Sequence, residues 1–456
     1  MGVIDPRVAV KTLGGCKVLS PFYEHVMKTS ARDRGFLCDS ERVLYDVTTC
    51  GAEITGEECG HEYCPEKEDL PTSFSFERAG PREKIYFRPA DVRAGIVTCG
   101  GLCPGLNNVI YALTTALWRN YQVREIFGFR FGYAGLVADS GYAPVRLDPD
   151  MVDGWTGLGG TKLGSSRGNQ DPRRMVDFLE KNEINILFAV GGDGTMRGAL
   201  DIAEEIDRRA AKISLIGIPK TIDNDIVFLD TTFGYRTAVE VAAKAIESAH
   251  VESKGAPNCV GLVKLMGRDS GFIACAASLA TGYPNYVLIP EQPVNLDKFL
   301  TSLKRRLFKR QHAVVVVAEG VGQELMQAEN APKDASGNAV YGDIGLFLKN
   351  AIAQRFKQEK FEHSIKYIDP SYTIRSVPAN ADDAVYCLHL GQDAVHAAMA
   401  GKTEILLGSV NGKMVHLPIG LIVNKRKKVD LFSPLWRMVT QMTEQLDIFA
   451  DNAPED

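Results

Sequence analysis

Apolar runs alternate with amphipathic stretches through the middle of the chain. Residues 184–190 and 213–218 are largely apolar, and each run leads into a turn that contains glycine or proline. Such continuous runs are typical of strands that are buried on both faces of a parallel sheet. A similar strand is expected at 94–98, with helices expected over 108–118 and 196–210. This βαβα order predicts a parallel sheet covered by helices on both faces.

A second group of apolar runs follows, and helical stretches separate most of them, which predicts a second α/β lobe. These runs lie at 260–265, 286–289, 313–318 and 365–368. Near the C-terminal end, Asn411-Gly412 stands between two further runs, 405–410 and 413–418. Asn-Gly between two such runs is a strong hairpin signal, so a β-hairpin is expected here.

Residues 1–90 mix short apolar pieces with a charged loop at 66–69, and they predict an N-terminal extension that packs on the body. Four cysteines fall in this part at spacings that match no standard zinc arrangement. A zinc site and a solvated loop with unpaired thiols therefore both remain open for Cys38, Cys50, Cys59 and Cys64.

Length and charge narrow the class of protein. A chain of 456 residues exceeds what one core usually serves, so two lobes are expected. The formal net charge of −5 argues against nucleic acid or an anionic membrane as the main partner. The chain has no run of ~20 apolar residues and no recognisable leader, so a cytoplasmic location is the expectation.

The turn Gly191-Gly192-Asp193-Gly194-Thr195 follows the first apolar run. Open α/β sheets bind ligands at the carboxyl ends of their strands, where this turn lies. Asp193 is the natural ligand of Mg²⁺, which takes one or two carboxylates together with phosphate oxygens and water. The alternative is an aspartate that only caps the next helix or interacts with its dipole.

The second turn, 219–225, places Asp223 and Asp225 on either side of Asn224, after Lys220. Two carboxylates at this spacing suit a general base and a partner in the metal shell, as phosphoryl transfer to a hydroxyl requires. The alternative is an Asx-turn cluster with a purely local role.

Three further segments, at 99–107, 159–168 and 266–271, combine glycines with cations. Glycine turns let backbone N–H groups approach an anion. Arg167 and Arg268 can spread their charge over a transferring phosphoryl group. A tight turn, a polar loop or a surface arginine would explain each segment alone, but together they indicate a magnesium-dependent phosphoryl transferase.

These five segments, in this order and spacing, make residues 79–445 resemble the phosphofructokinase family. The resemblance implies transfer of a phosphoryl group to the 1-hydroxyl of fructose 6-phosphate. It also implies an α/β fold of two Rossmann-like parallel-sheet lobes that face each other across a cleft, after an N-terminal extension. The expected boundaries are 1–90 for the extension, 91–234 with 375–425 for the ATP lobe, and 235–374 with 426–456 for the sugar-phosphate lobe.

The resemblance also implies a role for each site residue. Asp223 is the base, Thr221 and Asp225 support it, Asp193 holds Mg²⁺, and Arg167 and Arg268 stabilise the phosphoryl group. The expected ATP-binding residues are Gly101, Tyr133, Arg167, Gly168, Asp193, Gly194, Thr195, Gly198 and Lys220. The expected substrate-binding residues are Thr221, Asp223, Met266, Gly267, Arg268, Glu319, Lys366, Tyr372 and Arg375.

Three positions depart from the bacterial members of the family. Tyr111 and Thr115 stand where those relatives carry arginines for an allosteric nucleotide, so a bacterial-type effector site is not expected. Cys259 stands where they contribute an arginine from a neighbouring subunit to the sugar phosphate. The resemblance further implies a homo-oligomer, most simply a tetramer, whose effector it does not name.

Two positions bear on the phosphoryl donor. Pyrophosphate-using members usually have aspartate where this chain has Gly194, and lysine where it has Lys220. A carboxylate at 194 would repel the α-phosphate of ATP by about 4 kcal/mol at ~4 Å and an effective dielectric of ~20. Lys220 favours any phosphate donor. Gly194 therefore predicts ATP, as in the enzymes of plants and trypanosomatids, which resemble a pyrophosphate-type frame.

Three alternatives remain. One is a pyrophosphate-dependent phosphofructokinase. Another is a non-catalytic regulatory subunit, which would be expected to lose the base or the metal carboxylate. The third is an NAD or diacylglycerol kinase, since these also use Gly-Gly-Asp-Gly, but they lack the segments at 219–225 and 266–268.

Overall fold

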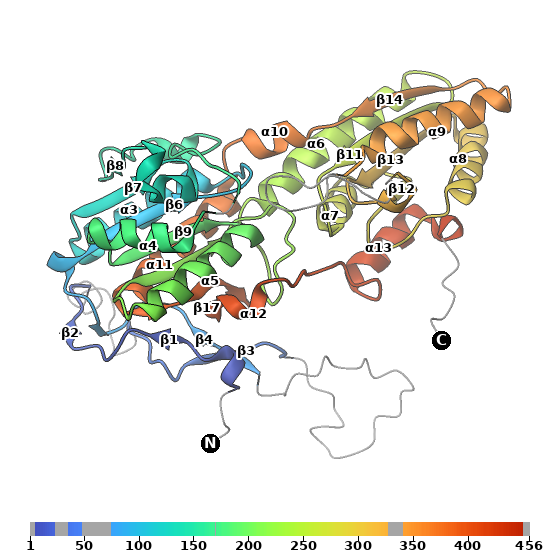
Figure 1. Cartoon of the computed structure of the whole chain (residues 1–456). Coiled ribbons are helices and arrows are strands. Elements are labelled where there is room, and N and C mark those ends of the chain that lie inside the picture. Colours follow the sequence, from blue (N-terminus) through green and yellow to red (C-terminus); the bar gives the residue numbers. More distant parts are fainter. Residues whose placement is uncertain (1–4, 23–34, 48–73, 169, 327–340, 450–456) are drawn as a thin grey trace, which may run out of the picture.

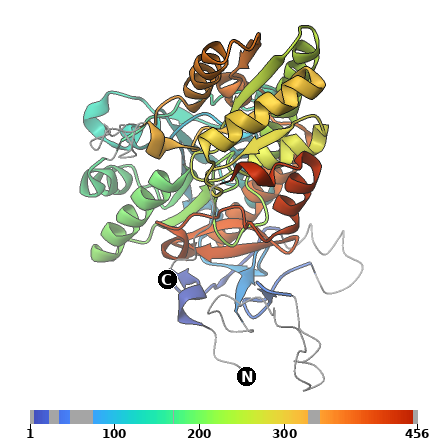
Figure 2. The same cartoon turned by 90° about the vertical axis from the view of Figure 1, so that its right-hand side faces the viewer.

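The computed structural model describes residues 5–22, 35–47, 74–168, 170–326 and 341–449. The chain forms two α/β lobes that lie side by side, one larger and one smaller (Figure 1). Seen from the end of the small lobe, the N-terminal strands lie along one side of the molecule (Figure 2). The predicted fold class, two α/β lobes with parallel sheets, is confirmed.

A nine-stranded sheet forms the large lobe, in the order β3-β4-β17-β16-β10-β9-β6-β7-β8. Its inner strands β16, β10, β9, β6 and β7 are parallel, and the flanking pairs are antiparallel. The bounds are β3 Arg42–Leu44, β4 Ser75–Arg78, β6 Arg93–Thr98, β7 Glu125–Phe129, β8 Val145–Arg146, β9 Ile186–Gly191, β10 Ser214–Pro219, β16 Ile405–Val410 and β17 Lys413–Pro418. The strands predicted at 94–98, 184–190 and 213–218 are therefore present.

Alternate residues of the central strands enter two separate cores. In β9, Ile186 and Phe188 belong to the core that also contains residues of α3 and α11. Leu187 and Ala189 belong to the core that contains residues of α4 and α5. Because side chains alternate between the faces of a strand, both faces of the sheet are buried, as the apolar runs predicted. These helices are α3 Leu106–Tyr121, α4 Pro172–Lys181, α5 Asp193–Arg208 and α11 Ala381–Met399.

The small lobe holds a four-stranded sheet with the order β12-β13-β11-β14, and all its pairs are parallel. The strands are β11 Cys259–Leu265, β12 Tyr286–Leu288, β13 His312–Ala318 and β14 Ser364–Ile368. All four match the predicted apolar runs. The remaining helices are α6 Tyr235–Lys254, α7 Phe272–Thr281, α8 Leu296–Arg310, α9 Ile344–Gln358, α10 Ser371–Ser376, α12 Ile419–Ile422 and α13 Pro434–Thr443. Among the described helices, none is long and apolar enough to span a membrane.

The N-terminal part contributes strands to the body. β1 Lys11–Thr12 pairs with β15 Lys402–Thr403, and β2 Val18–Leu19 pairs with β5 Lys84–Ile85. β3 and β4 extend the large sheet beyond β17. The charged loop at 66–69 and three of the four cysteines discussed above lie outside the described residues, namely Cys50, Cys59 and Cys64. Cys38 is described as a free, exposed thiol.

The predicted hairpin and two helix starts show how glycine and asparagine set the turns. β16 and β17 pair antiparallel across Asn411 and Gly412, whose φ angles of 49° and 69° suit a tight two-residue turn. The helix expected from residue 108 begins at Leu106, directly after Gly105 with φ 101°. The helix expected from 196 begins at Asp193, because Gly192 is its N-cap. Asp193 therefore lies in the first helical turn and not before it.

Replacing Gly391 by alanine is expected to destabilise the large lobe. Gly391 lies where α11 packs on α3, and a Cβ there would stand 2.4 Å from Ala112 Cβ and 3.1 Å from the Leu113 nitrogen. Overpacking of this kind costs typically about 1–3 kcal/mol, which exceeds the ~1 kcal/mol that alanine gains over glycine in helix propensity. Urea unfolding monitored by circular dichroism should show a lower midpoint. Gly420→Ala in α12, where a Cβ meets no described atom within 4 Å, is the matched control and should not lower it.

Candidate active site

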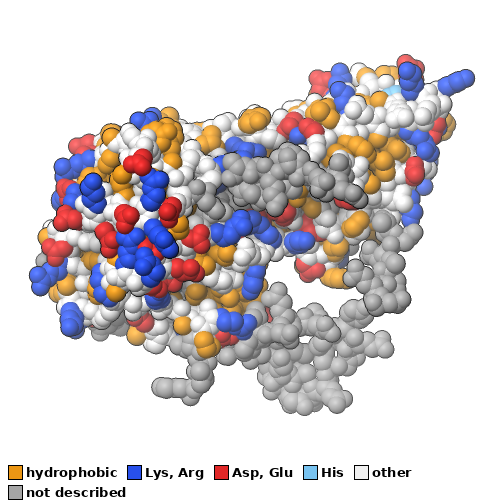
Figure 3. Space-filling view, in the orientation of Figure 1, with side chains coloured by type: hydrophobic (Ala, Val, Ile, Leu, Met, Phe, Trp, Pro, Cys, Tyr) orange, Lys and Arg blue, Asp and Glu red, His pale blue; other side chains and the backbone are white. Residues whose placement is uncertain are grey.

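A cleft of about 820 Å³ opens between the lobes, and both lobes contribute to its lining. In the space-filling view, basic side chains gather along the middle of the molecule, where the lobes meet (Figure 3). The cations that line the cleft are Arg167, Arg197, Lys220, Arg268, Arg375 and Arg426. The carboxylates are Asp193, Asp201, Asp223, Asp225, Asp269 and Glu319. A cavity with so many charges of both signs suits a polyanionic ligand that binds together with a cation.

The cleft is built from strand ends. Residues 99–103 follow β6, 192–195 follow β9, and 220–225 follow β10. From the small lobe, Arg268 follows β11 and Glu319 follows β13. Because parallel strands end on the same edge of their sheet, the topology of each lobe brings its own segments together at the cleft.

Asp193 is placed to hold a metal ion. Its side chain is 12% exposed, and its Oδ2 lies 3.2 Å from Arg197 Nη2 and 3.1 Å from Arg426 Nη2. Gly192 occupies the N-cap and no side-chain capping bond is made, so helix capping does not explain this aspartate. Within the described ranges, no three His, Cys, Asp or Glu side chains are close enough to hold a metal by themselves. One carboxylate in a cleft that is also lined by six cations nevertheless fits Mg²⁺, which takes its other ligands from phosphate and water.

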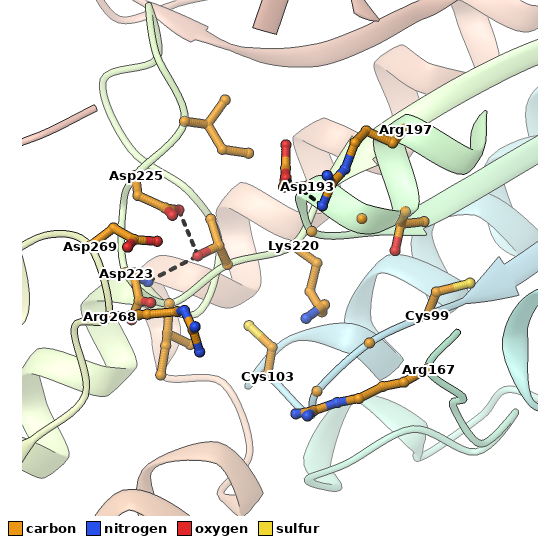
Figure 4. A pocket seen from close by; sticks show the side chains of 18 of the residues that line it. Cys99, Cys103, Arg167, Asp193, Arg197, Lys220, Asp223, Asp225, Arg268 and Asp269 are labelled. Atoms are coloured by element: carbon orange, nitrogen blue, oxygen red, sulfur yellow. Dashed lines mark hydrogen bonds and ion pairs between the residues drawn. The ribbon is translucent and has the colours of Figure 1, made fainter. Parts of the chain in front are cut away.

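Asp223 is a half-buried residue that lines the cleft beside Arg268 and Asp269, and its Oδ1 atom is buried (Figure 4). Its Oδ1 has no hydrogen-bond partner in the described part of the chain. Burial, followed by the charges of Asp225 and Glu319, raises the pKa of Asp223 to about 8. An unpaired carboxylate oxygen with a raised pKa is what a general base at near-neutral pH requires.

Thr221 links the two aspartates of this loop. Its hydroxyl donates to Asp225 Oδ1 at 2.9 Å and accepts from the Asp223 nitrogen at 3.1 Å (Figure 4). Asn224 between them has φ 56°, a left-handed conformation that asparagine tolerates better than most residues. The loop is therefore a tight turn, as the alternative interpretation held, but the turn also fixes both carboxylates at the cleft.

Several cations converge on the glycine turn after β6. A Cβ on Gly101 would lie 3.6 Å from Arg167 Nη2 and 3.9 Å from Arg375 Nη1. A Cβ on Gly100 would lie 3.5 Å from Lys220 Nζ. Lys220 is buried, and this burial lowers its pKa. Guanidinium groups, an ammonium and a side-chain-free backbone in one place make a site for phosphate groups.

Open space beside Gly194 bears on the donor. A Cβ built on Gly194 meets no described atom within 4 Å, and the residue has no positive φ. Sterically and conformationally, this position therefore accepts a side chain. Because the residue at 194 is glycine, the cleft has room beside Asp193 and Thr195, and both of these residues line the cleft.

Most of the predicted site residues line this one cleft. They are Gly101, Tyr133, Arg167, Gly168, Asp193, Gly194, Thr195, Lys220, Thr221, Asp223, Asp225, Met266, Arg268, Glu319 and Arg375. The Tyr133 hydroxyl donates to the Thr195 carbonyl oxygen at 2.7 Å, which fixes the turn after β9.

Four predicted residues do not line the cleft. Gly198 lies one turn into α5, under the ring of Tyr133, and Gly267 packs against the Ser270 carbonyl oxygen. Lys366 lies in the middle of the edge strand β14, with Nζ 3.8 Å from Glu252 Oε2. Tyr372 on α10 is 86% exposed. The single chain does not bring Lys366 and Tyr372 to the cleft, and their roles stay predictions.

Sequence reasoning missed several lining residues. Asp269 directly follows Arg268 in the segment 266–271. Its position next to a predicted site residue could have identified it as a lining residue. Arg197 lies one helical turn after Asp193 on α5, where an i,i+4 pair is expected. Arg426 belongs to an irregular stretch that carries no motif. The thiols of Cys99 and Cys103 also line the cleft, but burial raises the pKa of both, so they are protonated and unsuited to nucleophilic attack.

Comparison with known proteins gives consistent relatives. A family profile described as phosphofructokinase matches residues 93–398. The ATP-dependent 6-phosphofructokinase of Borreliella burgdorferi is 45% identical over 445 residues, 96% of each chain. The enzyme of that name from Trypanosoma cruzi is 42% identical over 447 residues, 97% of this chain and 88% of the other. ATP-dependent 6-phosphofructokinase 7 of Arabidopsis thaliana is 45% identical over 390 residues, 84% of this chain and 80% of the other.

Solved structures agree on the fold. The pyrophosphate-dependent phosphofructokinase of Marinobacter aquaeolei superposes with a TM-score of 0.64 at 20% identity, over 80% of this chain and 94% of the other. Pichia pastoris phosphofructokinase in its T-state superposes with a TM-score of 0.59 at 21% identity, over 78% of this chain and 36% of the other. At this level of identity, the likeness concerns the fold alone.

Proposed function

The chain belongs to the phosphofructokinase family, and from that premise we propose that it transfers the γ-phosphoryl group of ATP to the 1-hydroxyl of fructose 6-phosphate. The products are fructose 1,6-bisphosphate and ADP, as in glycolysis. One observation carries the proposal within the site: the unpaired, buried carboxylate oxygen of Asp223 shares a cleft with a group of phosphate-binding cations.

ATP is the proposed donor. The relatives compared above at 42–45% identity are named as ATP-dependent enzymes. The open space beside Gly194 supports the same donor, because no carboxylate stands there to repel the α-phosphate of ATP. Lys220 suits a phosphate of either donor and does not decide between them.

Magnesium is the proposed cofactor, with Asp193 as its protein ligand. When bound, the ion would neutralise part of the phosphate charge and orient the donor. The turn 192–195 then presents the first N–H groups of α5 towards the same place, where the helix dipole favours an anion.

The residues of the chain account for the transfer itself. Asp223 accepts the proton of the sugar 1-hydroxyl. The oxygen of that hydroxyl forms a bond to the γ-phosphorus, while the bond from this phosphorus to the β–γ bridging oxygen breaks. Asp225 and Thr221 keep Asp223 oriented. Arg167 and Arg268 would stabilise the charge that is shared among the phosphoryl oxygens. Glu319, Met266 and Arg375 line the cleft and are the proposed contacts of the sugar phosphate.

The pH dependence of kcat/KM for fructose 6-phosphate should report Asp223. The base must be ionised, and its pKa in the empty cleft is raised to about 8. Since kcat/KM reports groups of the free enzyme, we expect it to fall about tenfold per pH unit below that value and to level off above it. A profile that stays flat from about pH 6 to 9 would contradict this assignment of the base.

Initial rates with fructose 6-phosphate, ATP and magnesium test the proposed function. Formation of fructose 1,6-bisphosphate, followed with aldolase, and its loss on addition of EDTA are expected. The 1-deoxy analogue of the sugar, which lacks the acceptor hydroxyl, is the matched control and should not turn over. A regulatory subunit would give no product, but the presence of Asp193, Asp223, Arg167 and Arg268 in the cleft favours catalysis.

Assembly and location are also part of the proposal. A homotetramer in the cytoplasm is what the family resemblance implies. Sedimentation equilibrium tests the first and imaging of the tagged protein tests the second.

A further inference from the structure

Residues 423–433, which we call the crossing segment, lead from α12 in the large lobe to α13 in the small lobe (Figure 1). Its backbone is fixed on both sides. The Lys427 nitrogen donates to the Asp225 carbonyl oxygen at 2.8 Å. The Val429 nitrogen donates to Glu291 Oε1 at 2.7 Å, and the same oxygen accepts from the Gly271 nitrogen at 3.0 Å. The segment is therefore held to both lobes where they meet.

Arg426 lies in this segment and enters the cleft. Its Nη2 is 3.1 Å from Asp193 Oδ2, and its Nε is 3.6 Å from Asp225 Oδ2 and 3.7 Å from Asp269 Oδ2. These three carboxylates follow β9, β10 and β11, so one guanidinium joins strand ends from both sheets. Its side chain is 30% exposed, which leaves it able to move.

Arg426 and a metal ion would compete for Asp193. A guanidinium and Mg²⁺ bind to the same lone pairs of a carboxylate. The two cations also repel each other, so they do not bind well to one carboxylate at the same time. Without a cation, the carboxylates of Asp193, Asp225 and Asp269 would repel one another. The metal-free cleft therefore needs a counter-ion between them. Within the described part of the chain, Arg197 forms an ion pair with Asp193 and with no other carboxylate of the cleft, so it does not join the strand ends.

We propose that Arg426 is a positioning residue that joins Asp193, Asp225 and Asp269 in the metal-free enzyme and releases Asp193 when magnesium enters with the nucleotide. The inference rests on the proposed function. It makes Arg426 the residue that sets how strongly nucleotide binding depends on the metal. It also links Asp193 of the large lobe to Asp269 of the small lobe.

The test is the ratio of the ATP dissociation constant in EDTA to that in excess magnesium, measured by calorimetry. In the wild type, metal-bound nucleotide must displace Arg426, whereas metal-free nucleotide need not. Arg426→Lys keeps the charge but loses the planar fork that reaches several carboxylates. The ratio should rise by up to roughly fivefold in Arg426→Lys and further in Arg426→Gln, since a partly exposed ion pair contributes about 0.2–1 kcal/mol.

Arg197→Lys is the matched control, because a lysine can keep the single pair one turn along α5, and its ratio should stay at the wild-type value. A ratio in Arg426→Lys and Arg426→Gln that equals or falls below the wild-type ratio would overturn the inference. Turnover of the wild type with ATP distinguishes a failure of the proposed function from a failure of the proposed role of Arg426. Wild-type turnover with unchanged ratios rejects only the role of Arg426, whereas no wild-type turnover rejects the proposed function.

Discussion

Asp223→Ser is expected to lower kcat by at least ~10²-fold, because removal of a general base typically costs about 10²–10⁴-fold. The serine hydroxyl cannot accept the proton of the 1-hydroxyl at neutral pH. Asp223 lines the cleft, and its Oδ1 is buried and has no hydrogen-bond partner in the described part of the chain. Single-turnover rates with saturating ATP and fructose 6-phosphate measure the loss directly.

The stability of this variant separates catalysis from folding. The pKa of Asp223 is raised in the folded protein, so between its unfolded value and about 8 the folded state binds more protons than the unfolded state. The free energy of unfolding therefore falls as pH rises through that range, and serine removes this effect. Asp223→Ser should unfold at an equal or higher temperature than the wild type at pH ~8. Asp201→Ser, which changes another carboxylate of the same cleft, is the matched control and should keep most of its activity.

Gly194→Asp is expected to reduce kcat/KM for ATP by roughly 10²–10³-fold, from a repulsion of about 4 kcal/mol at most between the new carboxylate and the α-phosphate. The structure makes this variant informative, because a Cβ at 194 meets no described atom within 4 Å. The chain should fold as before, and the change in rate then reports charge in the cleft.

Gly194→Asn is the control for size. Asparagine has nearly the shape of aspartate and no charge, so it should retain most of the activity with ATP. Any slow turnover of the wild type with pyrophosphate, which has no α-phosphate to be repelled, should fall far less in Gly194→Asp than turnover with ATP. Equal losses in the aspartate and asparagine variants would mean that space, and not charge, decides the donor at this position.

The sequence predicted those parts of the fold that local patterns determine. The apolar runs located the strands of both sheets, and Asn411-Gly412 located the hairpin, because burial and turn geometry act on neighbouring residues. The N-terminal strands were not predicted. β1 and β2 have two residues each and bury little, so their pairing depends on β15 and β5 far along the chain.

The site also contains residues that local patterns predict and residues whose positions depend on distant parts of the chain. Asp193 and Asp223 follow buried strands, and the parallel order of the strands brings them to one cleft. Arg426 could not be predicted, because its position depends on where residues 423–433 cross between the lobes. Lys366 and Tyr372 were assigned through the family resemblance alone, and the single chain places them outside the cleft.

The most direct test of the central claim compares ATP and pyrophosphate as donors at matched concentration, with fructose 6-phosphate and magnesium. We expect turnover with ATP and none of comparable rate with pyrophosphate, because Gly194 leaves room for the α-phosphate. Turnover with pyrophosphate alone would show that Lys220 and its surroundings select the donor and would contradict the account.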